Sequence, residues 1–190
     1  MNLHQLWLIT RYSFTEIWRN KTFRVAFMVL IPLLIAYQVS FQSDMFNIPV
    51  EYTLVLSSFI PTQNAYMFNL LLVFPLATMG FWVHKQKKYN TLEALLVHPQ
   101  GNDTYSTGFI LGIIIAFMIM GSISLALAGL INLFASPTSF QPLIYLFYLV
   151  TLFLPTIVFV VGITSFLAAR CFKNGTVTTF FMLVYLSVDI

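Results

Sequence analysis

Charged residues are scarce in this chain of 190 amino acids: only 8% of them are Asp, Glu, Lys or Arg, whereas 59% are hydrophobic. A soluble domain usually carries about 25% charged residues, so this chain has too few polar groups to cover a surface in water. The composition therefore excludes an ordinary soluble domain and predicts a membrane protein, most of whose surface contacts lipid. The net charge of +3 is no indication of nucleic-acid binding, and no nucleic-acid partner is expected.

The side chains and motifs that enzymes use are also missing. The single cysteine, Cys171, excludes an internal disulfide and a cysteine metal cluster. His84 and His98 could share a metal, but no carboxylate cluster supports them, and surface histidines are the better interpretation. The sequence has no H-E-x-x-H, no G-x-S-x-G and no phosphate-binding glycine loop. We therefore predict no catalytic residue, no bound cofactor and no metal site.

Ionisable residues are almost absent from the long apolar runs, where Gln38 and Asn69 are the notable polar side chains. Carriers driven by protons or sodium usually need a buried carboxylate or a broken helix for the coupling ion. If this protein moves a substrate, its energy is therefore expected to come from a partner.

Apolar runs long enough to cross a bilayer are plentiful, since roughly 20 helical residues span the hydrocarbon core. They predict an all-α fold, a polytopic bundle of transmembrane helices, with spans at 23–41, 66–83, 107–134 and 142–169. A fifth run, 176–190, would extend only about 22 Å as a helix and ends near the charged Asp189. We expect the chain to stop within this span, either as a fragment of a longer permease or as an incomplete gene product.

Basic residues fall on one side of the membrane if the four spans alternate in direction. The loops on the other side, 42–65 and 135–141, contain none, and the first carries Asp44 and Glu51. By the positive-inside rule the N-terminus and the 84–106 and 170–175 loops are cytoplasmic. The nine basic residues are Arg11, Arg19, Lys21, Arg24, Lys85, Lys87, Lys88, Arg170 and Lys173.

The first 22 residues form a separate predicted segment, ahead of the transmembrane domain at 23–190. Apolar side chains recur there at three- and four-residue steps, which places them on one face of a helix. They suit an amphipathic helix lying in the cytoplasmic membrane interface, although an extension of the first span into water is the alternative. The predicted face comprises Leu3, Leu6, Trp7, Phe14, Ile17 and Trp18, with Ser13 elsewhere.

Two further details of the apolar regions lead to predictions. The external loop 42–65 contains a short apolar stretch that Pro61 is expected to end, after which Thr62 could cap the second span. Gly108 and Gly112 form a G-x-x-x-G pair at the start of the third span. This pair is compatible with dimerisation, but packing within the chain is at least as good an interpretation.

Residues 89–103, "YNTLEALLVHPQGND", separate the second and third spans. Asn90 is a good N-cap, and Glu93 can reach back to the amide of Asn90 as in a capping box. Leu92, Leu95 and Leu96 then share one face of a short helix. This helix could rest on the membrane surface, or its leucine face could fit a groove on a cytosolic protein.

The stretch Thr91 to Pro99, "TLEALLVHP", resembles the cytoplasmic loop of type-2 ATP-binding-cassette exporter permeases. That family commonly shows Gly-Thr-Leu-Glu-x-Leu-Leu-x-x-Pro after its second span. The matching residues are Thr91, Leu92, Glu93, Leu95, Leu96 and Pro99. Asn90 replaces the family's glycine, and the basic residue often found at the start of the third span is absent. In the order of its predicted helices and loops, most of the chain resembles this family. The matching sequence motif is confined to this segment.

The resemblance implies that this segment is a coupling helix, which docks the six matching residues on a separate cytosolic ATPase subunit. ATP and magnesium would be bound by that partner and not by this chain. A second permease half, as a homodimer, a fused repeat or a paired copy, would complete the transporter in the inner membrane of a prokaryote. The 1–22 helix would be the family's interfacial elbow, and six spans per half would be expected.

Two other function classes remain open at this point. The chain could be a non-transporting membrane assembly or anchoring protein, whose 89–99 helix would lie on lipid without an ATPase. A membrane enzyme acting on lipid is disfavoured because the catalytic groups are missing. The transported substrate does not follow from the sequence.

The distribution of basic residues leads to a topology prediction that single-cysteine labelling can check. In a Cys171→Ala background, Asp44→Cys should react with a membrane-impermeant maleimide on intact cells, because the 42–65 loop is external. Gln86→Cys should react only after permeabilisation, because its loop lies on the basic, cytoplasmic side. Labelling of Gln86→Cys on intact cells would contradict this topology.

Overall fold

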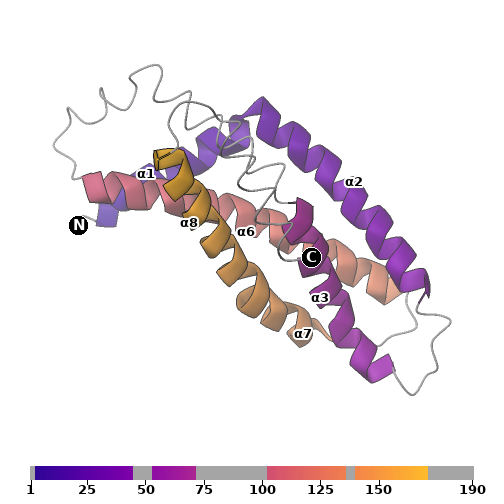
Figure 1. Cartoon of the computed structure of the whole chain (residues 1–190). Coiled ribbons are helices and arrows are strands. Elements are labelled where there is room, and N and C mark those ends of the chain that lie inside the picture. Colours follow the sequence, from indigo (N-terminus) through magenta and orange to yellow (C-terminus); the bar gives the residue numbers. More distant parts are fainter. Residues whose placement is uncertain (1–2, 45–52, 72–101, 136–139, 171–190) are drawn as a thin grey trace. The chain divides into compact units, whose positions relative to one another are not determined.

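The structure, a computed structural model, describes residues 3–44, 53–71, 102–135 and 140–170, and it is entirely helical apart from short junctions within these ranges. Figure 1 shows the elements in chain order. They are α1 (Leu3–Arg19), α2 (Lys21–Asp44), α3 (Thr53–Leu71), α6 (Asn102–Ala135), α7 (Pro142–Tyr148), the π-helical turn η3 (Leu149–Phe153) and α8 (Leu154–Arg170).

Three of the described helical segments are long and apolar enough to cross a membrane: Phe23–Ser43, Thr104–Phe134 and Pro142–Ser165. They correspond to the first, third and fourth predicted spans, so the all-helical, multi-span prediction is confirmed at this coarse level. Only 66–71 of the predicted second span is described, as the end of α3. The rest of that span and the whole 176–190 span lie outside the described residues.

The prediction that Pro61 ends a helix is wrong. Helix α3 begins at Thr53, inside the stretch expected to be an external loop, and continues through Pro61 to Leu71. Thr62 therefore lies within the helix and does not cap a new one. Proline removes one backbone hydrogen bond, and membrane helices tolerate this because neighbouring groups can satisfy the freed carbonyl.

The chain divides into two compact units, and each is described by itself. Unit 1 comprises Met1–Ala26, Leu72–Phe117 and Val158–Ile190, and unit 2 comprises Phe27–Leu71 and Met118–Ile157. Unit 1 therefore holds α1 with the first part of α6, whereas unit 2 holds α3, α7 and η3 with the second part of α6.

In unit 1, α1 approaches α6 closely at the two glycines of the G-x-x-x-G pair. A Cβ atom built on Gly108 would lie 2.9 Å from Ile9 Cγ2. One built on Gly112 would lie 2.8 Å from both the Thr10 carbonyl oxygen and Ser13 Cβ. Only glycine permits so close a backbone approach. The two predicted uses of the pair are thus resolved in favour of packing within the chain.

This contact determines which side of α1 is buried against the protein. The buried residues are Ile9, Thr10, Ser13 and Ile17. Ser13 therefore faces the protein interior, although the sequence pattern predicts it on the polar side of the helix. Of the predicted membrane-facing side chains, Ile17 is buried against the protein, whereas Leu3 and Trp7 are 75% and 60% exposed. The sequence could not distinguish these faces, because apolar side chains lie on both.

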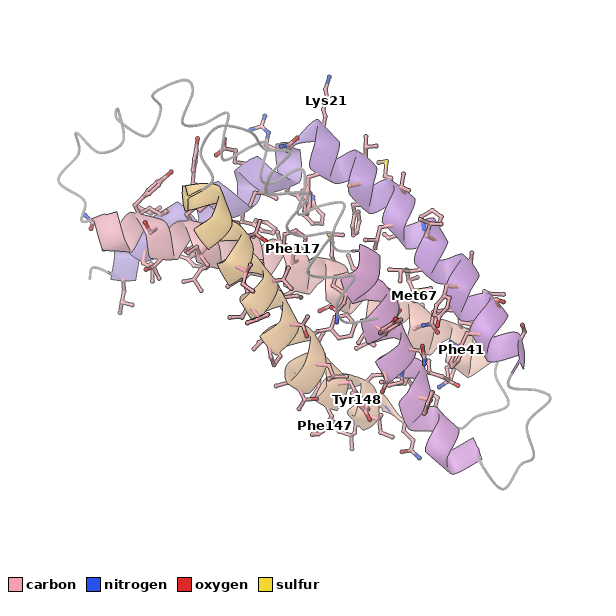
Figure 2. The ribbon with its side chains drawn as sticks, in the orientation of Figure 1. Lys21, Phe41, Met67, Phe117, Phe147 and Tyr148 are labelled. Atoms are coloured by element: carbon pink, nitrogen blue, oxygen red, sulfur yellow. The ribbon has the colours of Figure 1, made fainter. Side chains whose placement is uncertain are left out.

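An aromatic series connects α1 to α2 and α6 within unit 1. The rings of Phe14 and Trp18 stack, Trp18 contacts Phe23, and Phe23 meets Phe117 edge-on with centroids 5.8 Å apart. Phe117, labelled in Figure 2, is fully buried on α6. Edge-on pairs of this kind add stability beyond area burial. They hold the α1–α2 junction, where Arg24 also donates to the Arg19 carbonyl oxygen at 3.2 Å.

In unit 2, the fourth predicted span contains a π-helical turn that the sequence did not reveal. The Leu154 amide donates to the Leu149 carbonyl oxygen, five residues back, directly before Pro155. Proline clashes with the carbonyl four residues before it, and one wide turn relieves that clash. The Thr151 and Thr156 hydroxyls donate to the carbonyls of Phe147 and Leu152, so these acceptors remain paired.

The wide turn places Phe153 against α6 and α3. Phe153 is buried and its ring centroid lies 5.2 Å from that of Phe68. A Cβ atom on Gly121 would approach Phe153 Cδ1 to 2.7 Å, so the small residue in α6 makes room for this ring. Figure 2 shows Phe147 and Tyr148 at the end of α7 just before this turn, and Met67 on α3.

The close approach at Gly112 predicts that two glycine-to-alanine substitutions in unit 1 change the free energy of unfolding by different amounts. Gly112→Ala should lower the free energy of unfolding by about 1–3 kcal/mol, because α1 must shift to admit the methyl group. The matched control is Gly162→Ala in α8, where nothing lies within 4 Å of the new Cβ. There alanine should be neutral or stabilise the helix by about 0.5–1 kcal/mol. Unfolding in mixed micelles measures both, and equal effects would contradict the described packing.

Candidate functional site: a buried amide network

The residues predicted to dock an ATPase, Thr91 to Pro99, lie outside the described residues, as do His84 and His98. The polar site that the structure does describe is in unit 2. It is a network of side-chain amides and one hydroxyl, contributed by three helices. Its members are Gln38 and Gln42 of α2, Asn64 of α3 and Ser124 of α6, together with the backbone carbonyl of Ala128.

These side chains are positioned by helical periodicity. Gln38 and Gln42 stand four residues apart and so share one face of α2, and Ser124 and Ala128 do the same on α6. All four side chains of the network are at most 3% exposed. Buried amides are costly unless they are hydrogen-bonded, so their mutual contacts hold the three helices in one arrangement.

The hydrogen bonds run in one direction along the network. Gln42 Nε2 donates to the Ala128 carbonyl oxygen at 3.2 Å and to Gln38 Oε1 at 3.1 Å. Gln38 Nε2 donates to Asn64 Oδ1 at 3.4 Å. Asn64 Nδ2 in turn donates to Ser124 Oγ at 3.0 Å, and at this end of the network the Ser124 hydroxyl donates back to Asn64 Oδ1 at 3.1 Å.

The Ala128 carbonyl determines this direction. Amide oxygen and nitrogen atoms are normally assigned from their hydrogen-bond partners, because an amide can be turned by 180°. A backbone carbonyl can only accept, so the Gln42 atom facing Ala128 must be the nitrogen. Gln38 must then present its oxygen to Gln42, and Asn64 its oxygen to Gln38. One acceptor therefore fixes the orientation of three amides.

Two buried oxygens have no hydrogen-bond partner among the described residues: Gln42 Oε1 and Asn69 Oδ1. An unsatisfied buried acceptor costs about 1–3 kcal/mol. The orientation of Gln42 cannot be reversed to avoid this cost, because its nitrogen is needed by Ala128. Gln42 Oε1 is thus a fully buried acceptor that the direction of the network leaves without a described partner.

Two further polar pairs flank the network and also join helices of unit 2. The Tyr37 hydroxyl donates to Gln63 Oε1 at 3.0 Å, and the Tyr37 ring stacks on Phe41, which is labelled in Figure 2. Asn132 Nδ2 donates to the Tyr145 hydroxyl at 2.9 Å, which joins α6 to α7. Tyr37 and Asn132 are thus each matched with a polar group on a neighbouring helix.

The chemistry of this site is neutral. In the described segments of unit 2, Asp44 at the end of α2 is the one residue with a carboxylate, and no Lys, Arg or His is present. No group of His, Cys, Asp or Glu residues that could hold a metal is found in the part of the chain that the structure describes. The network can donate and accept hydrogen bonds, but it contains no carboxylate, imidazole or amine that could act as a base toward the Ser124 hydroxyl.

Sequence reasoning found this site only in part. It singled out Gln38 and Asn69 as polar residues within spans. It missed Asn64, because that residue was assigned to an external loop, and it missed Gln42 and Ser124. The spacing of Gln38 and Gln42 was a usable signal, since two amides four residues apart on an apolar helix must face the same neighbour. Comparisons with protein families, curated proteins and solved structures find no match to this chain.

The network predicts that replacing two serines of α6 by alanine changes the stability of the chain by different amounts. Ser124→Ala removes the bond between α6 and Asn64, and should destabilise the chain by about 1 kcal/mol, within the range for hydrogen bonds between membrane helices. Ser122→Ala is the control, because the Ser122 hydroxyl bonds to the Met118 carbonyl of its own helix. It should change stability by less than about 0.5 kcal/mol.

A double-mutant cycle makes this prediction specific. Asn64→Leu combined with Ser124→Ala should cost less than the sum of the two single changes, because either one already breaks the shared bond. Unfolding in mixed micelles gives the four free energies. Strict additivity would show that the two side chains do not interact.

Proposed function

We propose that this chain is a permease subunit of an exporter driven by a separate ATPase. The observation that carries the proposal is the segment Thr91 to Pro99, whose residues match the coupling loop of type-2 ATP-binding-cassette exporter permeases. It lies between two apolar runs and follows the basic cluster Lys85, Lys87 and Lys88, which favours the cytoplasm. The presence of three helices able to cross a membrane supports a multi-span permease.

The proposed mechanism divides the work between two proteins. The partner binds ATP and magnesium, and its closure displaces the short helix predicted at residues 92–97. Leu92, Leu95 and Leu96 make the apolar contact, as in other complexes in which a helix fits a groove. Asn90 and Glu93 stabilise the start of that helix. The displaced helix then tilts the adjoining spans and moves the substrate.

Helix α1 suits the role of an interfacial helix in this proposal, because part of its predicted apolar face is exposed. Its exposed large apolar side chains are Leu3, Trp7, Leu8 and Tyr12, while the opposite side packs on α6. An exposed face with tryptophan, tyrosine and the neighbouring Arg11 fits the headgroup boundary of a bilayer. The N-terminus would then lie on the cytoplasmic side of a prokaryotic inner membrane, beside a second permease half.

The proposal predicts that acidic substitutions on the leucine face abolish association with the ATPase. Leu95→Asp together with Leu96→Asp should prevent co-purification of an ATPase subunit encoded beside this chain, since two carboxylates cannot enter an apolar groove. The control is Ala94→Asp, which introduces the same residue on the opposite side of the predicted helix. It should leave association intact.

Retained association of the double variant would refute the docking role of residues 91–99. The alternative, a membrane assembly or anchoring protein, would need no ATPase. Cysteine labelling at 91–97 distinguishes the two, since protection that appears only with the ATPase present excludes a helix that simply rests on lipid.

A further inference from the structure

Three exposed basic side chains gather where α1 gives way to α2, within unit 1. Arg19 is the last residue of α1, and Lys21 and Arg24 lie in the first turn of α2. Figure 2 shows Lys21 projecting outward from the start of α2. Glu16 is the one carboxylate in α1 and this first turn, and its side chain is half-buried. The exposed surface formed by Arg19, Lys21 and Arg24, called the basic corner below, is therefore positively charged.

One hydrogen bond determines where the Arg24 side chain lies in this corner. Its Nη2 atom donates to the Arg19 carbonyl oxygen at 3.2 Å, so the guanidinium lies over the end of α1. The last carbonyls of a helix carry partial negative charge, which favours a cation there. Lys21 and Arg24 are three residues apart on one helix, so their side chains are neighbours and their like charges repel each other. An anion bound between them would relieve this repulsion.

The donors of the basic corner suit a phosphate group. A guanidinium carries several N–H donors in a planar fork, and the bond to Arg19 uses one of them. This fork matches the spacing of two phosphate oxygens, which is why arginine binds phosphate in a bidentate manner. Lys21 adds a second charge beside it, and its flexible stem can follow the anion.

The position of the corner along the chain indicates what carries the phosphate. The segment able to cross a membrane begins at Phe23, so Lys21 and Arg24 stand at its very edge. Val25, the next residue of that segment, is 60% exposed. A molecule that contacts both the cations and this apolar surface has an anionic phosphate and an apolar body. A phospholipid in the adjoining leaflet has this structure and holds its phosphate at this depth.

We propose that the basic corner is a binding site for the headgroup of an anionic phospholipid, whose phosphate accepts hydrogen bonds from Arg24 and lies beside Lys21 and Arg19. A zwitterionic lipid is disfavoured, because its own ammonium group is repelled by the three cations. The bound lipid neutralises the corner and holds the start of the first span at the membrane surface. This inference rests on the interfacial position proposed for α1, but it does not depend on docking to an ATPase.

Native mass spectrometry of the full chain, released from a non-ionic detergent, tests this proposal. The chain is titrated with dioleoylphosphatidylglycerol, which is anionic, and separately with dioleoylphosphatidylcholine, which has the same acyl chains. The wild type should bind the anionic lipid more tightly. Lys21→Gln should weaken that binding about fivefold, since one surface cation contributes about 1 kcal/mol. Arg24→Lys keeps the charge but loses the fork, and it should also weaken binding of the anionic lipid.

Arg11→Gln is the matched control. Arg11 is also exposed on α1. It lies about 12 Å along the helix from Arg19, and this distance exceeds the Debye length of about 8 Å at physiological ionic strength. The substitution removes the same charge from the chain as Lys21→Gln does, but from outside the corner. It should leave binding of the anionic lipid unchanged.

The ratio of the two lipid dissociation constants decides the outcome for each variant. A preference for the anionic lipid that falls in Lys21→Gln and Arg24→Lys, but not in Arg11→Gln, supports the site. Equal binding of both lipids by the wild type overturns it. An equal loss in Arg11→Gln overturns it as well, because the net charge of the chain would then attract the lipid. A variant that weakens both lipids alike counts against the site. No ATPase is present, so the result is independent of the Leu95→Asp and Leu96→Asp experiment.

Discussion

The structure depends on one constraint: polar groups that leave water must find partners inside the protein. Hydrocarbon offers no hydrogen bonds, so a chain that crosses it must pair its backbone within helices and its side chains between them. The described residues follow this rule closely. The hydroxyls of Thr151 and Thr156 pair with backbone carbonyls around the wide turn before Pro155, and the amides of α2, α3 and α6 pair with one another.

The same constraint explains why the two units are held differently. In unit 1, Ile9, Thr10 and Ser13 of α1 come close to α6 because Gly108 and Gly112 have no side chains of their own. In unit 2 directional hydrogen bonds specify which helices meet, since an amide must face a complementary group. Close packing of small residues and buried polar pairs are the two means by which helices associate when lipid is as apolar as their side chains.

The network also shows how a single backbone carbonyl can orient several side chains. The Ala128 oxygen fixes the Gln42 amide, and two more amides follow from it. The unpaired Gln42 Oε1 is therefore a consequence of the direction of the whole network.

The sequence by itself determined the helical class and three helices able to cross a membrane, because these depend on composition and on local period. The side of the membrane on which the basic residues lie stays a prediction. The sequence also marked residues 91–99 as a docking segment, which stays a prediction. Only the tertiary structure decided which face of α1 is buried, that α3 continues through Pro61, that a wide turn precedes Pro155, and that Gln42, Asn64 and Ser124 meet. These four findings have the same physical reason, because each depends on contacts with a neighbouring helix. The periodicity of a sequence shows which side chains share one face of a helix, but it does not show what packs against that face.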